Sequence, residues 1–344
     1  MAFDPLADEP QTRDLPSDEV AATARSAAAD LVVELGRAKT RSDGWQNAHL
    51  AQLLIDHALS ECLNRLAATG CWGEANRAPS DAFWQQAGPM LEAGSLQWRA
   101  RSKPLGYAGD HVMLRRIWEQ SCCDDPVGRL FDRYFLSLAA PQAVRARMQH
   151  VAGTFAARLL SHHGPEYRVV SVGAGPAIDL ELGLAAVPSS KIERTRIRLV
   201  DIDPGALEGA SERIGRVVSP ENLTSCRENL FRLAARPSAV AEAGGADLLI
   251  CTGLFDYLAD DVAVEMLRLF WRCLDQGGQM LVGNFAPHNP TRAYMEWIGN
   301  WYLIYRTADD LRRLGGLAGI PNEQMAIQVE RTGVDLFMVA TKAR

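Results

Sequence analysis

A glycine-rich turn is the first feature of this sequence that suggests chemistry. The segment from Val169 to Ala177 is typical of a buried strand that breaks at Gly173 and Gly175 and continues into a helix. Glycine suits such a turn because the chain turns sharply, and because a side chain would keep a nucleoside away from the backbone. An ordinary strand-to-helix connection has the same pattern, so the turn predicts a nucleoside site only together with other residues.

Two carboxylates follow the next apolar run. Segment 198–204 places Asp201 and Asp203 at the end of a strand, where doubly wound folds hold the hydroxyls of a ribose. This order fits both dinucleotide and S-adenosylmethionine binding. A dinucleotide favours G-x-G-x-x-G, whereas Ala177 and Ile178 follow the second glycine here without a third. This unit forms the last half of the chain and ends in a hairpin, so S-adenosylmethionine is the cofactor we expect.

Polar residues also follow the fourth and fifth apolar runs of this half. Tyr257 could place a ring or hydroxyl near a sulfonium, and Asp256 could orient a substrate or take a proton. Asn284 can both donate and accept hydrogen bonds in the same cleft. The alternative is that Tyr257 caps the sheet and Asp256 begins the next helix.

Cationic and aromatic residues come next along the chain. Arg292 and Arg306 could pair with a carboxylate of the cofactor or the substrate. Trp301, Tyr302 and Tyr305 could form an aromatic wall, because cations are attracted to ring faces. Structural ion pairs and core packing explain these residues equally well.

One loop in the first half stands out. Segment 103–110, Lys-Pro-Leu-Gly-Tyr-Ala-Gly-Asp, holds Tyr107 between two glycines and ends at Asp110. It could fold over a cofactor as part of a lid. Asp110 could equally do no more than cap the helix that follows.

The spacing of apolar residues divides the chain into two halves. Residues 17–164 have helical periodicity, which predicts an all-α cap or substrate domain, and residues 1–16 are expected to be disordered or frayed. Residues 165–344 alternate short apolar runs with amphipathic segments, which predicts an α/β domain with a mostly parallel sheet covered on both faces. The last two strands should form a hairpin and leave an antiparallel strand at one edge. The expected strands are 168–172, 197–202, 247–252, 279–285, 327–330 and 335–340, and the expected helices are 178–185, 204–217, 260–274 and 307–314.

Composition limits the partners. The 344 residues include 36 Lys and Arg against 42 Asp and Glu, a net charge of -6, so nucleic acid is not an expected partner. The seven cysteines have no metal-ligand spacing, which indicates free thiols and no metal. The acidic N-terminus is unlike a signal peptide, and no apolar run has the length of a membrane span. We therefore expect a cytoplasmic protein that acts on a small molecule, with its oligomeric state left open.

These features together resemble the class I S-adenosylmethionine-dependent methyltransferases. Within this class, the sequence more specifically resembles a bacterial group described as extracellular-factor 3-hydroxypalmitic acid methyl ester biosynthesis proteins. The segments that carry it are 103–110, the glycine turn, 253–258, 283–285, 295–296 and 301–306. The resemblance implies a seven-stranded Rossmann-like sheet whose last strand is antiparallel.

The resemblance also implies roles for individual residues. Gly173 and Gly175 would face the methionine part of the cofactor, and Asp201 the ribose. The adenine would lie against Glu228, Asn229 and Leu230. The sequence departs from the family pattern twice, with Ser171 in place of an acidic residue and Asn300 in place of an aspartate near the reaction centre.

Three functions remain open at this stage. The first is methyl transfer to a small carboxylate, hydroxyl or amine in a biosynthetic pathway. A carboxylate needs no base, whereas an amine or alcohol would need one, for which Asp256, Tyr257 or Asp110 are candidates. The second is cyclisation of S-adenosylmethionine to azetidine-2-carboxylate and methylthioadenosine, with which Asn300 and the aromatic residues are compatible. The third is a non-catalytic S-adenosylmethionine-binding protein, which Ser171 alone supports.

Overall fold

The computed structural model describes residues 17–229 and 245–343. Its described residues divide into two units of different texture. One unit comprises residues 143–288 and 304–343 and contains the sheet, and we call it the sheet unit. The other comprises residues 17–142 and 289–303, and we call it the helical unit. The expected disordered segment, 1–16, lies outside the described residues.

Two helices of the helical unit begin at aspartate caps. The side chains of Asp110 and Asp125 accept hydrogen bonds from the N–H groups of Met113 and Gly128, which caps α5 and α6. Pro89 lies in the last turn of the helix Arg77–Leu91, which is continuous through it. Its elements are α1 (Ser17–Arg41), α2 (Ala48–Ala67), η1 (Gly73–Asn76), α3 (Arg77–Leu91), α4 (Ser95–Ser102), α5 (His111–Glu119), α6 (Pro126–Ser137) and η5 (Tyr294–Ile298), together with the first residues of α7 (Ala139–Ser161).

Seven strands form one sheet among the described residues, in the order β3-β2-β1-β4-β5-β7-β6. They are β1 (Tyr167–Val172), β2 (Thr195–Asp201), β3 (Leu223–Arg227), β4 (Ala246–Cys251), β5 (Leu274–Phe285), β6 (Met325–Val329) and β7 (Asp335–Thr341). Strands β1 to β5 are parallel, and β7 runs antiparallel to both β5 and β6. The expected α/β fold with an antiparallel last strand is confirmed.

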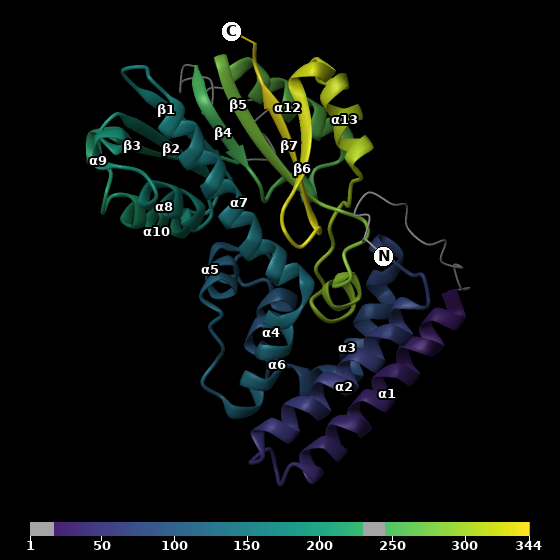
Figure 1. Cartoon of the computed structure of the whole chain (residues 1–344). Helices are drawn as coiled ribbons and strands as arrows, with labels where there is room; N and C mark the ends of the chain where they lie inside the picture. Colours follow the sequence, from purple (N-terminus) through teal and green to yellow (C-terminus); the bar gives the residue numbers. More distant parts are fainter. Residues whose placement is uncertain (1–16, 230–244, 344) are drawn as a thin grey trace. The chain divides into compact units, whose positions relative to one another are not determined.

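Helices cover both faces of this sheet (Figure 1). The alternation of side chains along the strands separates two apolar cores, because successive residues point to opposite faces. One core lies under α7, α8 (Ile178–Ala185) and α10 (Pro204–Ile214), and the other under α12 (Asp260–Cys273) and α13 (Ala308–Leu317). The short elements α9 (Ser189–Ile192), η2 (Pro220–Asn222), η4 (Phe255–Tyr257) and η6 (Asn322–Gln324) complete the unit.

Two details of the sheet differ from the sequence predictions. The run 223–227 was not among the expected strands, because its residues, LTSCR, are short of apolar side chains and mostly exposed. The antiparallel strand was expected at an edge, but β7 inserts between β5 and β6, so the edge strand is β6. This insertion places the apolar residues of β7 in both cores, whereas β6 remains half-exposed.

The bounds of the two units differ from the predicted domain boundary between residues 164 and 165. From Ala143 onward α7 belongs to the sheet unit, since Val151, Phe155 and Leu159 pack in one of its cores. Residues 289–303 follow β5 but belong to the helical unit, where Tyr294 stacks on Phe135.

No helix in the described ranges is both long and apolar enough to cross a membrane.

Candidate functional site

Most of the predicted site residues of the sheet unit lie where its parallel strands end. The chain leaves β1 for β2 and β3 on one side and returns to β4 on the other. Such a change in direction opens a crevice at the carboxyl ends of the strands in doubly wound folds. Because β7 is antiparallel, its first residue, Asp335, pairs with Phe285 at this same carboxyl edge.

The glycine turn after β1 has the backbone conformation that its sequence predicts. Gly173 and Gly175 have φ angles of 65° and 50°, in the left-handed region that favours glycine. The Gly173 N–H donates to the carbonyl oxygen of Val200 at 2.8 Å, and the Gly175 N–H donates to Asp201 Oδ2 at 2.9 Å. The turn is therefore fixed to the end of β2.

Asp201 fixes two segments of backbone. Its carboxylate is 4% exposed and accepts hydrogen bonds from Gly175 N and, at 3.0 Å, from Asp203 N. Burial raises its pKa, and these backbone N–H groups lower it in part. Asp203 in turn caps α10 by accepting from Gly205 N at 2.8 Å. Each carboxylate oxygen can accept a second hydrogen bond, so both side chains could still bind ribose hydroxyls. These ribose contacts stay predictions.

The residues expected at the adenine follow β3. The Glu228 N–H donates to the carbonyl oxygen of Asp201 at 2.9 Å, so this segment lies beside the end of β2. Glu228 and Asn229 are half-buried, whereas Leu230 lies outside the described residues. Ser171 is buried inside β1 and pairs with Leu199 and Ile250 of the neighbouring strands.

Arg306, predicted to pair with a substrate carboxylate, makes its contacts inside the protein, and a contact with a substrate stays a prediction. The side chain is 2% exposed. Its guanidinium donates to the carbonyl oxygens of Phe255 (2.8 Å) and Leu258 (2.5 Å), to Asn284 Oδ1 (2.7 Å), and twice to Asp260 Oδ1. Each of its N–H groups therefore has an acceptor inside the protein.

Asp256 and Asn284 belong to the same buried network. Asp256 Oδ1 accepts from Phe285 N at 2.7 Å and from Asn284 Nδ2 at 3.1 Å. Asn284 Nδ2 also donates to the carbonyl oxygen of Ile304 at 2.9 Å. Burial raises the pKa of Asp256 to about 6. These contacts tie the ends of β4 and β5 to residues 304–306. The cofactor contact of Asn284 and the catalytic role of Asp256 stay predictions.

Tyr257 and Tyr305 lie next to this network in the sequence. Tyr257 ends η4, and its N–H donates to the carbonyl oxygen of Leu254 at 3.0 Å. Both tyrosine side chains are half-buried. The network of Asp256, Asn284 and Arg306 thus fixes the backbone beside both tyrosines. Their contacts with a cofactor or substrate stay predictions.

Arg147 is a residue that the sequence analysis missed. It lies on α7 and is 6% exposed, yet among the described residues its guanidinium makes one hydrogen bond, to Asp335 Oδ2 at 3.2 Å. A Cβ atom at Gly253 would lie 3.8 Å from its Nη2 atom, so the guanidinium reaches the end of β4. The only sequence signal was a cation between Val144 and Met148 on the buried stripe of a helix.

Three carboxyl groups interact with Arg147. Burial raises the pKa of Asp179, in the first turn of α8, to about 6, and raises that of Asp335 well above its ordinary value. The charge of Arg147 lowers the pKa of both groups and of Asp256, but burial has the larger effect. Asp335 is fully buried, and its Oδ1 has no hydrogen-bond partner within the described ranges. Because burial favours the neutral acids, the guanidinium retains capacity for an additional anion.

Two predicted substrate contacts of the helical unit also have structural roles. Asp110 is fully buried, caps α5 and pairs with Arg99 at 2.8 Å. Arg292 Nε donates to buried Glu296 at 2.9 Å, and its guanidinium lies 4.8 Å from the ring centroid of Trp72. Both side chains thus have partners within this unit, and their predicted contact with a substrate stays a prediction.

The site roles of Tyr107, Asn300 and Trp301, also in the helical unit, stay predictions. Tyr107 is half-buried in the loop between α4 and α5. Asn300 has a φ of 47°, a left-handed conformation that asparagine tolerates better than most residues. Trp301 is buried, and its N–H donates to the carbonyl oxygen of Met295 at 2.8 Å.

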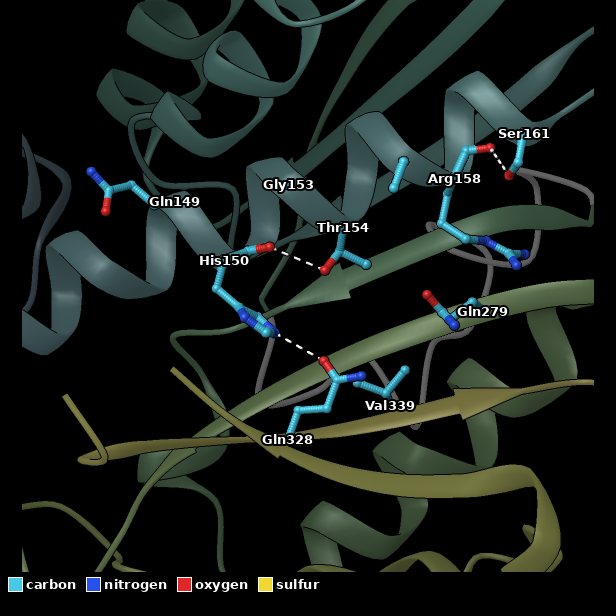
Figure 2. Close-up of a pocket in the computed structure, with 10 residues that line it drawn as sticks. Gln149, His150, Gly153, Thr154, Arg158, Ser161, Gln279, Gln328 and Val339 are labelled. Atoms are coloured by element: carbon cyan, nitrogen blue, oxygen red, sulfur yellow. Dashed lines mark hydrogen bonds between the residues drawn. The ribbon is translucent and has the colours of Figure 1, made fainter. Parts of the chain in front are cut away.

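An open groove lies on the sheet unit outside the carboxyl edge (Figure 2). It has a volume of about 570 Å³ and runs along α7 from Gln149 toward Ser161. Its wall includes His150, which stacks on Phe337 with ring centroids 4.6 Å apart and shares a 3.1 Å hydrogen bond with Gln328. The groove is open, and its lining combines amide and hydroxyl side chains with His150, Arg158 and small apolar residues, so it lacks the acids and glycine turn of the carboxyl edge.

No family model and no curated protein matches the sequence. Among solved structures, the chain is similar to a possible exported protein from Bordetella parapertussis, with 19% identity, a TM-score of 0.54, and coverage of 96% of this chain and 99% of that one. It is also similar to an O-methyltransferase family protein from Burkholderia thailandensis, with 15% identity, a TM-score of 0.46 and coverage of 95% of each chain. A magnesium protoporphyrin IX methyltransferase from Synechocystis PCC 6803 has 16% identity and a TM-score of 0.44 over 67% of this chain and 89% of its own. The Bordetella structure therefore shares its fold with nearly the whole of this chain.

Proposed function

We propose that this protein binds S-adenosylmethionine at the carboxyl edge of the sheet unit and methylates a small carboxylate. The observation that carries the proposal is Arg147, a buried guanidinium with one hydrogen bond among the described residues. Its one ion-pair partner is Asp335, whose neutral form is favoured by burial, and a buried cation is costly without a paired anion. A ligand with a carboxylate would supply that anion next to Gly253.

The residues at this edge fit the parts of S-adenosylmethionine. Arg147 would hold its amino-acid carboxylate, since guanidinium and carboxylate form bidentate hydrogen bonds. Gly173 and Gly175 leave the backbone open beside Asp201, which would accept from the ribose hydroxyls. The bound cofactor supplies an electrophilic methyl group on a sulfonium.

The contribution of the chain itself is positioning. The network of Asp256, Asn284 and Arg306 holds the ends of β4 and β5 together, and with them the backbone of Tyr257. Correct placement of two reacting groups can supply about 7–11 kcal/mol of a reaction barrier. We therefore assign catalysis in this unit mainly to the placement of the reacting groups by the fixed ends of β4 and β5.

The acceptor class follows from the state of the acids. Asp256 is engaged by Phe285 and Asn284, and Asp335 is fully buried beside Arg147. Neither is placed to take a proton from an incoming alcohol or amine. A carboxylate acceptor is already anionic at neutral pH and needs no base, so it suits this site better.

Product analysis tests this function. The purified protein is incubated with S-adenosylmethionine alone and then with a panel of small carboxylic acids, alcohols and amines. We expect no turnover without an acceptor, and S-adenosylhomocysteine with at least one carboxylic acid. Methylthioadenosine with azetidine-2-carboxylate from the cofactor alone would establish cyclisation instead, and binding without any product would leave a cofactor sensor.

A further inference from the structure

Three cations of the helical unit form a group that the proposed function does not use. They are Arg77 at the start of α3, Arg101 near the end of α4, and Lys103, which follows that helix. Lys103 also opens the loop 103–110 that the sequence analysis singled out. We call these three residues the cation group.

Arg101 forms the fixed part of the cation group. Its guanidinium donates to the side chain and the carbonyl oxygen of Ser80, and to the carbonyl oxygen of Trp297. It also pairs with Asp81 at 2.6 Å and lies 4.7 Å from the ring centroid of Trp84. The positive charge is therefore held in place on the surface of α3.

Arg77 brings a second charge to the same surface. Its guanidinium lies 4.6 Å from the ring centroid of Tyr302. Its ion-pair partner, Glu74, has a side chain that is 86% exposed, so water screens this pair strongly. The Arg77 side chain is itself 49% exposed, so its guanidinium is accessible to a ligand in solution.

Lys103 is the least satisfied member of the cation group. It is half-buried, and its ammonium has no hydrogen-bond acceptor in the part of the chain that the structure describes. Burial lowers its pKa most, and repulsion from Arg77 and Arg101 lowers it further. The acid that opposes this effect is Asp81, which already pairs with Arg101.

From these contacts we propose that the cation group binds the oxyanion of a small molecule, a carboxylate or a phosphate. Such a group would supply acceptors for the three N–H donors of Lys103 and would offset the repulsion among the three cations. Arg77 would contribute further donors, and Arg101 would act through its charge. This site is separate from the residues assigned to S-adenosylmethionine, so it is testable without that cofactor.

Competitive lysine labelling of the full-length protein tests this site. The chain has four lysines, Lys39, Lys103, Lys191 and Lys342, so three of them serve as references for folding and for reagent. The protein is treated with trace acetic anhydride from pH 6 to pH 11, and each lysine is quantified by peptide mass spectrometry. Separate series contain inorganic phosphate, hexanoate, or sodium chloride at matched ionic strength.

We expect Lys103 to titrate at a lower pH than an ordinary lysine. Saturating phosphate or hexanoate should slow its labelling at least tenfold, while the reference lysines change less than twofold. Protection by phosphate alone identifies a phosphate site, and protection by hexanoate alone identifies a carboxylate site. Unchanged labelling with both anions, or equal slowing with chloride, would overturn the proposal.

A matched pair of variants separates specific binding from general charge. Arg77→Gln should weaken anion protection of Lys103 at least threefold. Arg37→Gln removes an arginine from an equivalent exposed i,i+3 ion pair, with Glu34 in α1, and should leave protection unchanged. Equal effects of the two substitutions would also contradict a built site.

Discussion

At the scale of residues, the contrast between two buried arginines determines how the site is interpreted. Arg306 has an acceptor inside the protein for each of its N–H groups, whereas Arg147 makes one hydrogen bond among the described residues. Both are nearly inaccessible to water. A guanidinium whose donors are already used cannot bind a ligand without losing contacts, so ligand recognition is assigned to Arg147.

Arg147→Gln should weaken S-adenosylmethionine binding at least tenfold, about 1.4 kcal/mol. The reason is the loss of a charge-assisted hydrogen bond to the amino-acid carboxylate. Methylthioadenosine lacks that carboxylate, so its dissociation constant should not change. Isothermal titration calorimetry with both ligands measures the difference.

Arg158→Gln is the control for this prediction. Arg158 lies on the same helix and donates to the carbonyl oxygen of Gly277, outside the carboxyl edge. Its substitution should leave both dissociation constants within about twofold, well under 1 kcal/mol. An equal loss of both ligands in Arg147→Gln would show a disturbed fold and would contradict the assigned contact.

At the scale of elements, polar contacts connect the strand ends to the segments that follow them. Asp201 connects β2 to the glycine turn, and the network around Arg306 connects the ends of β4 and β5 to residues 304–306. Each connection joins segments that are distant in the sequence. The carboxyl edge is therefore held by side chains that sequence analysis assigned to ligands.

Arg306→Met should destabilise the protein by about 3–5 kcal/mol, because it leaves buried acceptors of Phe255, Leu258 and Asn284 without their donor. Urea unfolding followed by circular dichroism measures this loss. Arg313→Gln is a suitable control, since Arg313 pairs with the same Asp260 but its side chain is 50% exposed. Its cost should stay below about 1 kcal/mol, and similar costs for both variants would contradict the network.

At the scale of the whole molecule, the two units are not consecutive in the sequence. The sheet unit includes α7 from Ala143 onward, and residues 289–303 of the helical unit interrupt it. The expected boundary at residue 164 follows the change from helical to alternating periodicity. Packing places α7 differently, because its apolar stripe belongs to a core of the sheet.

The fragment 165–344 should therefore fail to fold cooperatively. It lacks Val151, Phe155 and Leu159, whose burial contributes about 1.5–3 kcal/mol each, a large part of the roughly 5–15 kcal/mol net stability of a typical domain. The fragment 139–344 restores α7 and should show a sharper urea transition by circular dichroism. Equally cooperative unfolding of the two fragments would contradict this role of α7.

The sequence by itself determined the features that depend on local periodicity and backbone conformation. It predicted the alternation of strands and helices, the helix 178–185, the turn at Gly173 and Gly175, and the acids that end β2. These features are readable because apolar spacing and the need for a left-handed φ are properties of neighbouring residues. The short polar β3 and the insertion of β7 between β5 and β6 lacked such a signal.

Only the tertiary structure decided which polar residues are committed and which are available. Arg147 and Asp335 are 188 positions apart, and their pairing at the carboxyl edge follows from the packing of α7 and the direction of β7. Asp256, Asn284 and Arg306 have the residue types of a catalytic site, but the structure shows that they are buried and hydrogen-bonded to one another. The physical reason is that hydrogen-bond satisfaction and desolvation depend on all neighbours in space, which a local sequence pattern does not contain.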